Sequence, residues 1–315
     1  MRKLMLTFDV EDFISTNELP ALTILLKMLE KYKLKGLFFI SGHIAEKISS
    51  IPEIMELLKD HEIGFHSSGH SVRPIIAEYT DVKNYRQAYL ISVERETSYI
   101  NPLTGKVERE GGIYALQNLF KHKRIRAYRA PGMSWSPPNL EALAKLGIEF
   151  DFSSNISTSE PAFYKGITFY PYTFTQKWDG HLSDYKCLLS ALLKNKIAIL
   201  DLHPTWFVNK KMWDSIYYLG NPQTLLKVRT RSRKEVELLF TRFEILLKQI
   251  ILLQLSGLVD VDASLSATVN KLTVNQKQVQ KCYETSMRWS RKYFNYNPVF
   301  IRNHFNEFFR DAIKA

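Results

Sequence analysis

Three carboxylates and two histidines follow apolar runs near the start of the chain. The stretch "LTFDVEDF" supplies Asp9, Glu11 and Asp12, and "HSSGH" supplies His66 and His70. On a helical turn, histidines four residues apart lie on one side, within reach of one divalent ion. With one of the carboxylates they would leave a coordination position open for water on zinc or another divalent metal. A solvated loop is the alternative interpretation of the histidine motif alone.

Short apolar runs alternate with longer segments of helical periodicity. The expected strands cover residues 3–10, 35–41, 62–68, 125–131, 148–154 and 196–203. Helices are expected over residues 20–33, 52–61, 81–99, 137–147 and 184–195. This repetition predicts an α/β fold with a parallel sheet, either doubly wound or closed as a barrel. No glycine-rich phosphate loop follows these strands, which disfavours a nucleotide-binding version.

Polar residues gather where the expected strands end. Arg129, Asp151 and His203 stand at the ends of three later strands, as the carboxylates and histidines do at earlier ones. Because α/β sheets and barrels bind ligands at the carboxyl ends of their strands, these side chains are expected to share one site.

The composition is that of a globular protein. The chain has 315 residues, of which 45% are apolar and 24% charged, so material for a core is ample. The formal charge of +11 would favour anionic partners if the cations clustered. The densest basic segments, residues 121–126 and 227–234, come with no recognised nucleic-acid-binding module, so no nucleic-acid partner is expected.

Cysteine use and hydropathy indicate a cytoplasmic protein. Cys187 and Cys282 are far apart in helix-like segments, so buried thiols are expected rather than a disulfide or a thiolate zinc site. The basic start reaches Asp9 before the apolar region of a signal peptide could form. The longest apolar run, residues 245–255, is shorter than the about 20 residues that span a bilayer, so no transmembrane segment is expected.

The C-terminal part has a different pattern. A loop rich in tryptophan is expected to residue 221, then a helix over residues 232–255 and a strand over 257–265. We therefore expect one α/β domain over residues 1–270 and a helical extension over residues 271–315. The extension carries too many aromatic residues to leave exposed, so it should pack on the domain or on a second subunit, which makes a homo-oligomer possible.

Five segments in order, "TFDVED", "EIGFHSSGH", "RAPGMSWSP", "FDFSS" and "LDLHP", resemble the motifs of the polysaccharide deacetylase family that shares the NodB-homology domain. The resemblance covers residues 1–204. It implies a distorted (β/α) barrel with about seven parallel strands. It also implies a carbohydrate substrate and removal of acetyl groups with a divalent metal, zinc first, with cobalt or manganese as alternatives.

The resemblance also implies roles for the residues at the strand ends. His66 and His70 match the two metal-binding histidines, and Asp9 matches the general base. Val10 stands where most members have a second aspartate, so the third ligand is Glu11 or Asp12. We prefer Glu11, because it lies on the same side of an extended chain as Asp9.

The later motifs supply the other expected groups. Arg129 matches the arginine that pairs with the base and keeps it ionised. His203 matches the general acid, and Asp151 the carboxylate that sets the charge of that histidine, with a capping or loop role as its alternative. Gly132 matches the backbone N–H of the oxyanion hole, and Leu202, or else Leu200, would line the pocket for the acetyl methyl group.

The sequence thus predicts a metal-dependent deacetylase acting on an amide of a sugar or glycan. Hydrolysis of another amide, such as a linear or cyclic ureide, and glycan binding without catalysis are the alternatives. Four tryptophans in expected loops could line a glycan cleft or seal the core: Trp135, Trp178, Trp206 and Trp213.

Overall fold

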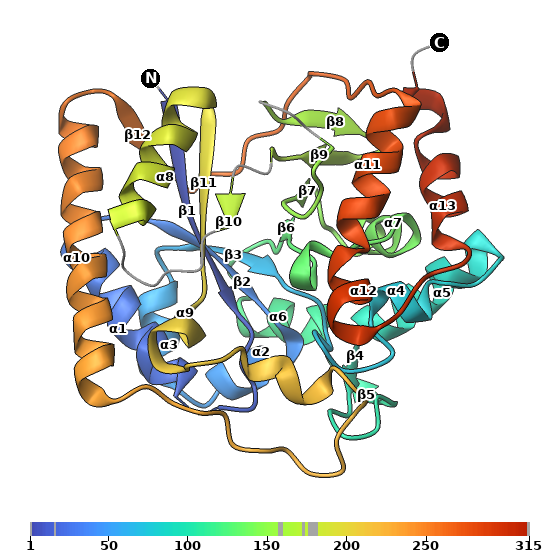
Figure 1. Ribbon diagram of the computed structural model, residues 1–315, viewed down its shortest axis with the longest axis horizontal. Coiled ribbons are helices and arrows are strands. Elements are labelled where there is room, and N and C mark those ends of the chain that lie inside the picture. The colour runs from blue at the N-terminus through green and yellow to red at the C-terminus, as the bar shows by residue number, and fades with distance from the viewer. Residues whose placement is uncertain (1, 16, 157–159, 172–173, 176–181, 314–315) are drawn as a thin grey trace.

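The architecture is a curled, largely parallel sheet with helices on its outer side (Figure 1). The computed structural model describes residues 2–15, 17–156, 160–171, 174–175 and 182–313. In these residues the sheet runs in the order β10 (Phe174–Thr175), β11 (Ile197–Leu202), β1 (Arg2–Val10), β2 (Gly36–Ile40), β3 (Glu62–Phe65), β6 (Ala127–Tyr128), β7 (Phe150–Asp151), β9 (Ile167–Phe169) and β8 (Ala162–Tyr164).

Neighbouring strands are parallel from β10 to β9, and only β8 pairs antiparallel. A further strand, β12 (Val259–Val261), pairs in parallel with the start of β1. The α/β class and the curled parallel sheet are therefore confirmed. The parallel path is longer than expected, because β9 and β10 form within a stretch that the sequence indicated to be irregular.

Helices and a small hairpin fill the connections. The helices of the first half are α1 (Glu18–Lys31), α2 (Gly42–Ile48), α3 (Pro52–Leu58), α4 (Ile76–Tyr79), α5 (Tyr85–Glu96), α6 (Ile113–Leu119) and α7 (Pro137–Lys145), with the hairpin β4 (Ser98–Ile100) and β5 (Val107–Glu110). The second half contains α8 (Leu182–Lys194), α9 (Pro204–Val208), α10 (Arg233–Leu255), α11 (Gln276–Ser286), α12 (Arg288–Phe294) and α13 (Ile301–Phe308). Short 3₁₀ turns are η1 (Pro131–Met133), η2 (Trp213–Tyr217) and η3 (Arg310–Ala312).

The alternation of side chains along β1 divides the interior into two layers. Leu4, Leu6 and Phe8 belong to the core between the sheet and the helices. Met5 belongs to a second core inside the curl of the sheet, and Thr7 and Asp9 follow it at spacing two, on the same face. The inner core consists of Met5, Leu37, Phe39, Ala127, Phe150, Phe152, Tyr170, Ile199 and Ala263. The apolar inner layer thus lies beneath the polar strand ends.

Local signals explain where two helices begin. The side chain of Asn84 accepts a hydrogen bond from Gln87 N at 3.0 Å, so α5 starts at Tyr85 rather than near residue 81. The carboxylate of Asp81 instead accepts backbone N–H bonds from Phe300 at 2.6 Å and Ile301 at 3.2 Å, at the start of α13. An acidic residue far away in sequence therefore caps a C-terminal helix.

The C-terminal helices pack against the sheet domain, beside β7 to β9 (Figure 1). Trp135 and Phe305 are both fully buried, with ring centroids 4.8 Å apart. The Tyr164 hydroxyl donates to the Phe308 carbonyl at 2.6 Å, and the ring of Phe309 stacks on that of Tyr164. The aromatic face of the extension is thus covered by the same chain. None of the described helices is long and apolar enough to cross a membrane.

We predict that Phe305→Ala lowers the free energy of unfolding by about 3–5 kcal/mol, because it leaves a cavity beside Trp135. Urea unfolding measured by circular dichroism gives this quantity. Phe163→Ala is the matched control, since that ring is 41% exposed, and it should cost less than about 1 kcal/mol. Equal costs for the two variants would contradict the packing described for the extension.

Candidate active site

The register of the sheet brings the polar residues of β1 and β11 together. Thr7 pairs with Asp201 and Phe8 with Leu202, so Asp9 lies beside His203 where the two strands end. Arg129 follows β6 and His66 follows β3, two strands that pair with each other. The expectation that strand ends gather these side chains into one place agrees with this geometry.

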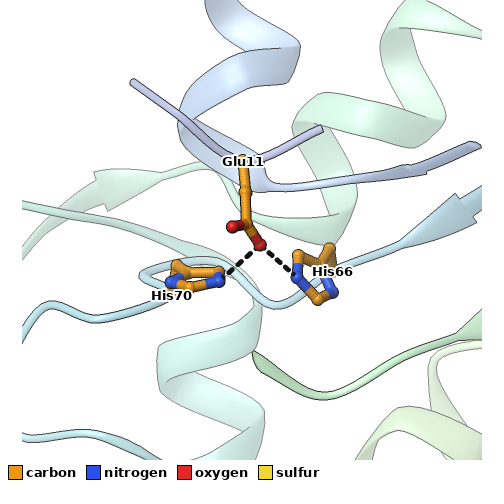
Figure 2. Close-up of side chains that lie close together, drawn as sticks. All are labelled: Glu11, His66 and His70. Atoms are coloured by element: carbon orange, nitrogen blue, oxygen red, sulfur yellow. Dashed lines mark hydrogen bonds and ion pairs between the residues drawn. The ribbon is translucent and has the colours of Figure 1, made fainter. Parts of the chain in front are cut away.

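Glu11, His66 and His70 form a compact group (Figure 2). Glu11 Oε2 lies 2.9 Å from His66 Nε2 and 2.7 Å from His70 Nε2. One ligand atom from each residue lies within 4.8 Å of the others, and all three residues are buried. The other carboxylate oxygen of Glu11 accepts a hydrogen bond from Trp213 Nε1 at 3.0 Å. Glu11 is thereby turned toward the histidines.

The far nitrogens of both histidines have acceptor partners. His66 Nδ1 lies 2.7 Å from the backbone carbonyl oxygen of Arg129. His70 Nδ1 lies 2.7 Å from Ser71 Oγ, which itself donates to Asp214 Oδ2 at 2.7 Å. Partners of this kind hold a proton on Nδ1 and fix each ring with Nε2 facing Glu11.

The loop "HSSGH" is irregular: β3 ends at Phe65, before the expected residue 68, and no helical turn brings the two histidines together. Ser67 and His70 have positive φ angles of 63° and 38°, which non-glycine residues seldom adopt. The buried carboxylate of Glu96 holds the loop by accepting from Ser67 Oγ at 3.0 Å and Ser68 N at 2.9 Å. It also accepts from Tyr79 and Asn139. Sequence reasoning missed Glu96, which lies in a helix without motif context.

Asp12 lies apart from the histidine pair. Its carboxylate accepts from Ile14 N and Ser15 N on one oxygen and from Thr205 Oγ1 and Asn209 Nδ2 on the other. Both of its oxygens are therefore used to join the β1 loop to α9. Of the two carboxylates that the sequence left open, only Glu11 belongs to the group with His66 and His70.

A buried arginine joins two carboxylates next to this group. Arg129 Nη1 lies 2.7 Å from both Asp9 Oδ1 and Asp201 Oδ1, and Nη2 donates to Thr7 Oγ1 at 2.8 Å. Its guanidinium carbon lies 4.3 Å from the centre of the Phe39 ring. Sequence reasoning missed Asp201, although its place two residues before His203, on the same face of the strand, could have indicated it.

The second carboxylate oxygen of Asp9 faces His66 and His203. Asp9 Oδ2 lies 3.7 Å from His66 Nε2 and 3.6 Å from His203 Nε2. His203 is stacked on Trp206, with ring centroids 4.0 Å apart. Asp9, Asp201 and His203 place one ligand atom each within 4.8 Å of one another.

Burial and neighbouring charges shift two carboxyl groups in opposite directions. Burial opposes ionisation of Glu11, but the charges of His70 and His203 and hydrogen bonds from His66 and His70 outweigh it. The pKa of Glu11 therefore lies well below its usual range. Burial raises the pKa of Asp201 to about 6, against the opposing charge of Arg129. The single positive charge of Arg129 therefore faces two buried carboxyl groups, Asp9 and Asp201. Asp201 stays protonated in mildly acidic solution.

Asp151 and Leu202 lie elsewhere than expected. The carboxylate of Asp151 accepts from Ser153 N at 3.2 Å and Ser154 N at 2.9 Å and makes no contact with His203, so its capping alternative fits the structure. Leu202 is fully buried in the core between sheet and helices and does not line the pocket. Because side chains alternate along β11, a residue between Asp201 and His203 must face outward.

A pocket of about 510 Å³ opens above these groups. Asp9, Glu11, His70, Asp201 and His203 are among its lining residues. Gly132 also lines it and has a φ of +54°; a Cβ there would lie 2.3 Å from the Trp289 ring. Only glycine fits where α12 covers η1 so closely.

The tryptophans divide between pocket and core. Trp206 lines the pocket, as does Trp289 of the C-terminal helices. Trp135 and Trp213 are fully buried, and Trp178 lies outside the described residues. The arrangement can hold a divalent cation beside one oriented carboxylate and one imidazole, which suits hydrolysis of an acyl group.

The comparisons with known proteins agree with the resemblance noted in the sequence. Residues 1–150 match the family model described as polysaccharide deacetylase, which confirms that resemblance for this part of the chain. No curated protein matches the sequence.

Several solved structures resemble the chain. A polysaccharide deacetylase from Bacillus cereus is 12% identical, with 88% of this chain and 98% of that chain covered and a TM-score of 0.43. The catalytic domain of a peptidoglycan N-acetylglucosamine deacetylase from Eubacterium rectale is 12% identical, with 87% and 94% covered and a TM-score of 0.43. A CE4 family pseudoenzyme from Bacillus anthracis is 14% identical, with 79% and 61% covered and a TM-score of 0.38. The chain spans less than two thirds of that pseudoenzyme, and at these values none of the likenesses bears on the chemistry.

We predict that Asp201→Asn becomes more stable relative to the original protein as the pH rises from 4 to 7. The folded state raises the pKa of Asp201 from 3.8 to about 6, so the stability that its bound proton contributes is complete below about pH 4 and is lost by about pH 6. An amide does not titrate. The difference in free energy of unfolding, from denaturant titrations at each pH, should move by more than about 1 kcal/mol. Asp60→Asn at an exposed site is the control; the same drift in both variants would contradict the assignment.

Proposed function

We propose that this chain, whose residues 1–150 match the polysaccharide deacetylase family, is a metal-dependent hydrolase that removes an acetyl group from an N-acetylated sugar or glycan. The observation that carries the proposal is the juxtaposition of Glu11, His66 and His70 with Asp9 and His203. All of these except His66 line one pocket. The first three would hold the cation, and the other two would move protons.

The donor set suits a divalent metal such as zinc. Two imidazole nitrogens and one carboxylate oxygen are common zinc ligands and leave a position open. Both Nδ1 atoms are engaged by acceptors, which leaves each Nε2 able to coordinate. When bound, the cation would polarise the acetyl carbonyl and lower the pKa of the attacking water.

The remaining groups account for the proton transfers. Asp9 Oδ2 takes a proton from the attacking water, while Arg129 holds the other oxygen of that carboxylate. The backbone N–H of Gly132 donates to the developing oxyanion; loss of such a donor typically costs about 100- to 1,000-fold in rate. His203 Nε2 gives a proton to the leaving nitrogen, so that the C–N bond breaks to yield acetate and a free amine.

The proposal is tested by incubating zinc-, cobalt- and manganese-loaded protein with N-acetylated sugars and measuring acetate. Release that depends on the metal is the expected result. Metal binding without release of acetate from any sugar would instead favour the non-catalytic alternative. Cleavage of a ureide alone would favour the other amide hydrolase.

We predict that Glu11→Gln weakens zinc binding by more than about 100-fold, because loss of a direct ligand should exceed the about 10- to 100-fold cost of losing a ligand's hydrogen-bond partner. Competition with a chromophoric chelator measures this affinity. Asp12→Asn is the matched control and should keep zinc within about threefold, since its oxygens bind α9 and the β1 loop. The opposite order would show that Asp12 is the ligand.

We predict that His203→Ala lowers kcat by about 100- to 10,000-fold through loss of the general acid. Zinc content, measured by mass spectrometry of the metal, should stay at the original level, because His203 is not part of the Glu11 group. If the variant loses its zinc together with its activity, His203 is a ligand and its assigned role is wrong.

A further inference from the structure

The C-terminal helices build one wall of the pocket above the proposed catalytic residues. The end of α11 and α12 contribute the lining residues Thr285, Arg288, Trp289, Lys292 and Tyr293. The Trp289 ring lies edge-on to His70, with centroids 6.1 Å apart. A substrate that reaches Glu11 and His70 must therefore pass this segment.

A second hollow, of about 580 Å³, continues along the same helices. Its lining residues are Lys281, Glu284, Thr285, Arg288, Arg291 and Lys292. Thr285, Arg288 and Lys292 also line the first pocket, so the two spaces adjoin. Four of the six residues are cations and one is a carboxylate, which gives this surface a local excess of positive charge.

The cations have few anionic partners within the described chain. Glu284 accepts a hydrogen bond from Gln280 at 2.6 Å instead. Arg291 Nη2 donates to the Tyr283 hydroxyl at 3.0 Å. No carboxylate in the described ranges makes an ion pair with Arg288 or Lys292, and both side chains are exposed. These two residues can therefore bind an anion without first breaking a salt bridge.

The floor and the rim of the pocket have opposite charge. Asp9, Glu11, Asp201 and Asp214 line the floor region, and Arg288 and Lys292 line the wall. The cations of the wall attract an anionic group, and the floor, where carboxylates would be partly neutralised by a bound divalent cation, offers a neutral acetamide no such charge. A substrate with a neutral acetamide and a separate anionic group would thus be oriented with its acetamide inward.

We propose that Arg288 and Lys292 bind a phosphate or diphosphate ester on the N-acetylated sugar, which makes the C-terminal helices the determinant of substrate class. The inference rests on the proposed function and deepens it. A guanidinium binds two oxygens of a phosphate at once, and a lysine ammonium serves phosphate as a point charge. Arg288 and Lys292 line the pocket, and Lys281 and Arg291 line the adjoining hollow. Four positive charges suit a doubly charged phosphoryl group better than they suit a substrate with a single carboxylate.

The test compares kcat/KM for acetate release from N-acetylglucosamine 1-phosphate, a uridine-diphosphate-linked and a polyprenyl-diphosphate-linked N-acetylglucosamine, and the neutral N-acetylglucosamine trimer. The zinc-loaded full chain should prefer a phosphorylated substrate. Which of the three gives the highest kcat/KM shows whether the phosphate belongs to a simple sugar phosphate, a nucleotide-linked sugar or a lipid-linked sugar. The variant Arg288→Gln/Lys292→Gln should reduce the ratio of phosphorylated to neutral kcat/KM at least about 10-fold. For the original protein, the ratio of phosphorylated to neutral kcat/KM should also fall as salt is raised from about 50 to about 300 mM, because salt screens the attraction between the exposed cations and the phosphate.

Lys277→Gln is the matched control, since it removes a cation from an exposed site on α11 outside both hollows. It should leave the ratio unchanged. A preference for the neutral trimer, or an equal loss with both classes of substrate in the double variant, would overturn the proposal.

Failure of the proposed function is distinguishable from failure of this inference. If no sugar releases acetate, the deacetylase assignment fails, and calorimetric binding of N-acetylglucosamine 1-phosphate decides about the phosphoryl site. A Kd weakened at least about 10-fold in the double variant supports the site. An unchanged Kd, or no binding to the original protein, overturns it.

Discussion

The site is held together by the paired hydrogen bonds from the guanidinium of Arg129 to Asp9 and Asp201. The guanidinium lies in a fully buried position between Asp9 and Asp201, above the ring of Phe39. Without it, two carboxylates would face each other in an apolar surrounding, and the loss of one partner from a buried ion pair typically costs about 3–5 kcal/mol. Its backbone carbonyl also orients His66. One residue therefore orients the carboxylate proposed as base and a histidine proposed as ligand.

Carboxylates from distant parts of the chain hold the two histidines in place. Glu96 fixes the loop between them, and Asp214 fixes His70 through Ser71. Both carboxylates are buried, so each must be satisfied by hydrogen bonds in the folded protein. The geometry of Glu11, His66 and His70 thus depends on the complete fold rather than on the loop that contains the histidines.

The C-terminal helices complete what the sheet leaves open. The sheet curls but ends in short edge strands, and α11 to α13 lie beside β7 to β9 (Figure 1). Trp289 reaches across to Gly132, where the absence of a Cβ allows contact. The extension therefore shares both the core, through Phe305, and the wall of the pocket.

The α/β class, the gathering of polar groups at the strand ends and the preference for Glu11 over Asp12 could all be predicted from the sequence. Each depends on short-range periodicity, because alternation along a strand decides which side chains share a face. The same rule, applied to β11, would have excluded Leu202 and indicated Asp201. The tertiary structure alone decided the conformation of "HSSGH", the supports from Glu96 and Asp214, and the position of Trp289 over Gly132. These contacts join segments separated by dozens to more than a hundred residues, and no local pattern records which distant side chain a folded chain will place opposite another.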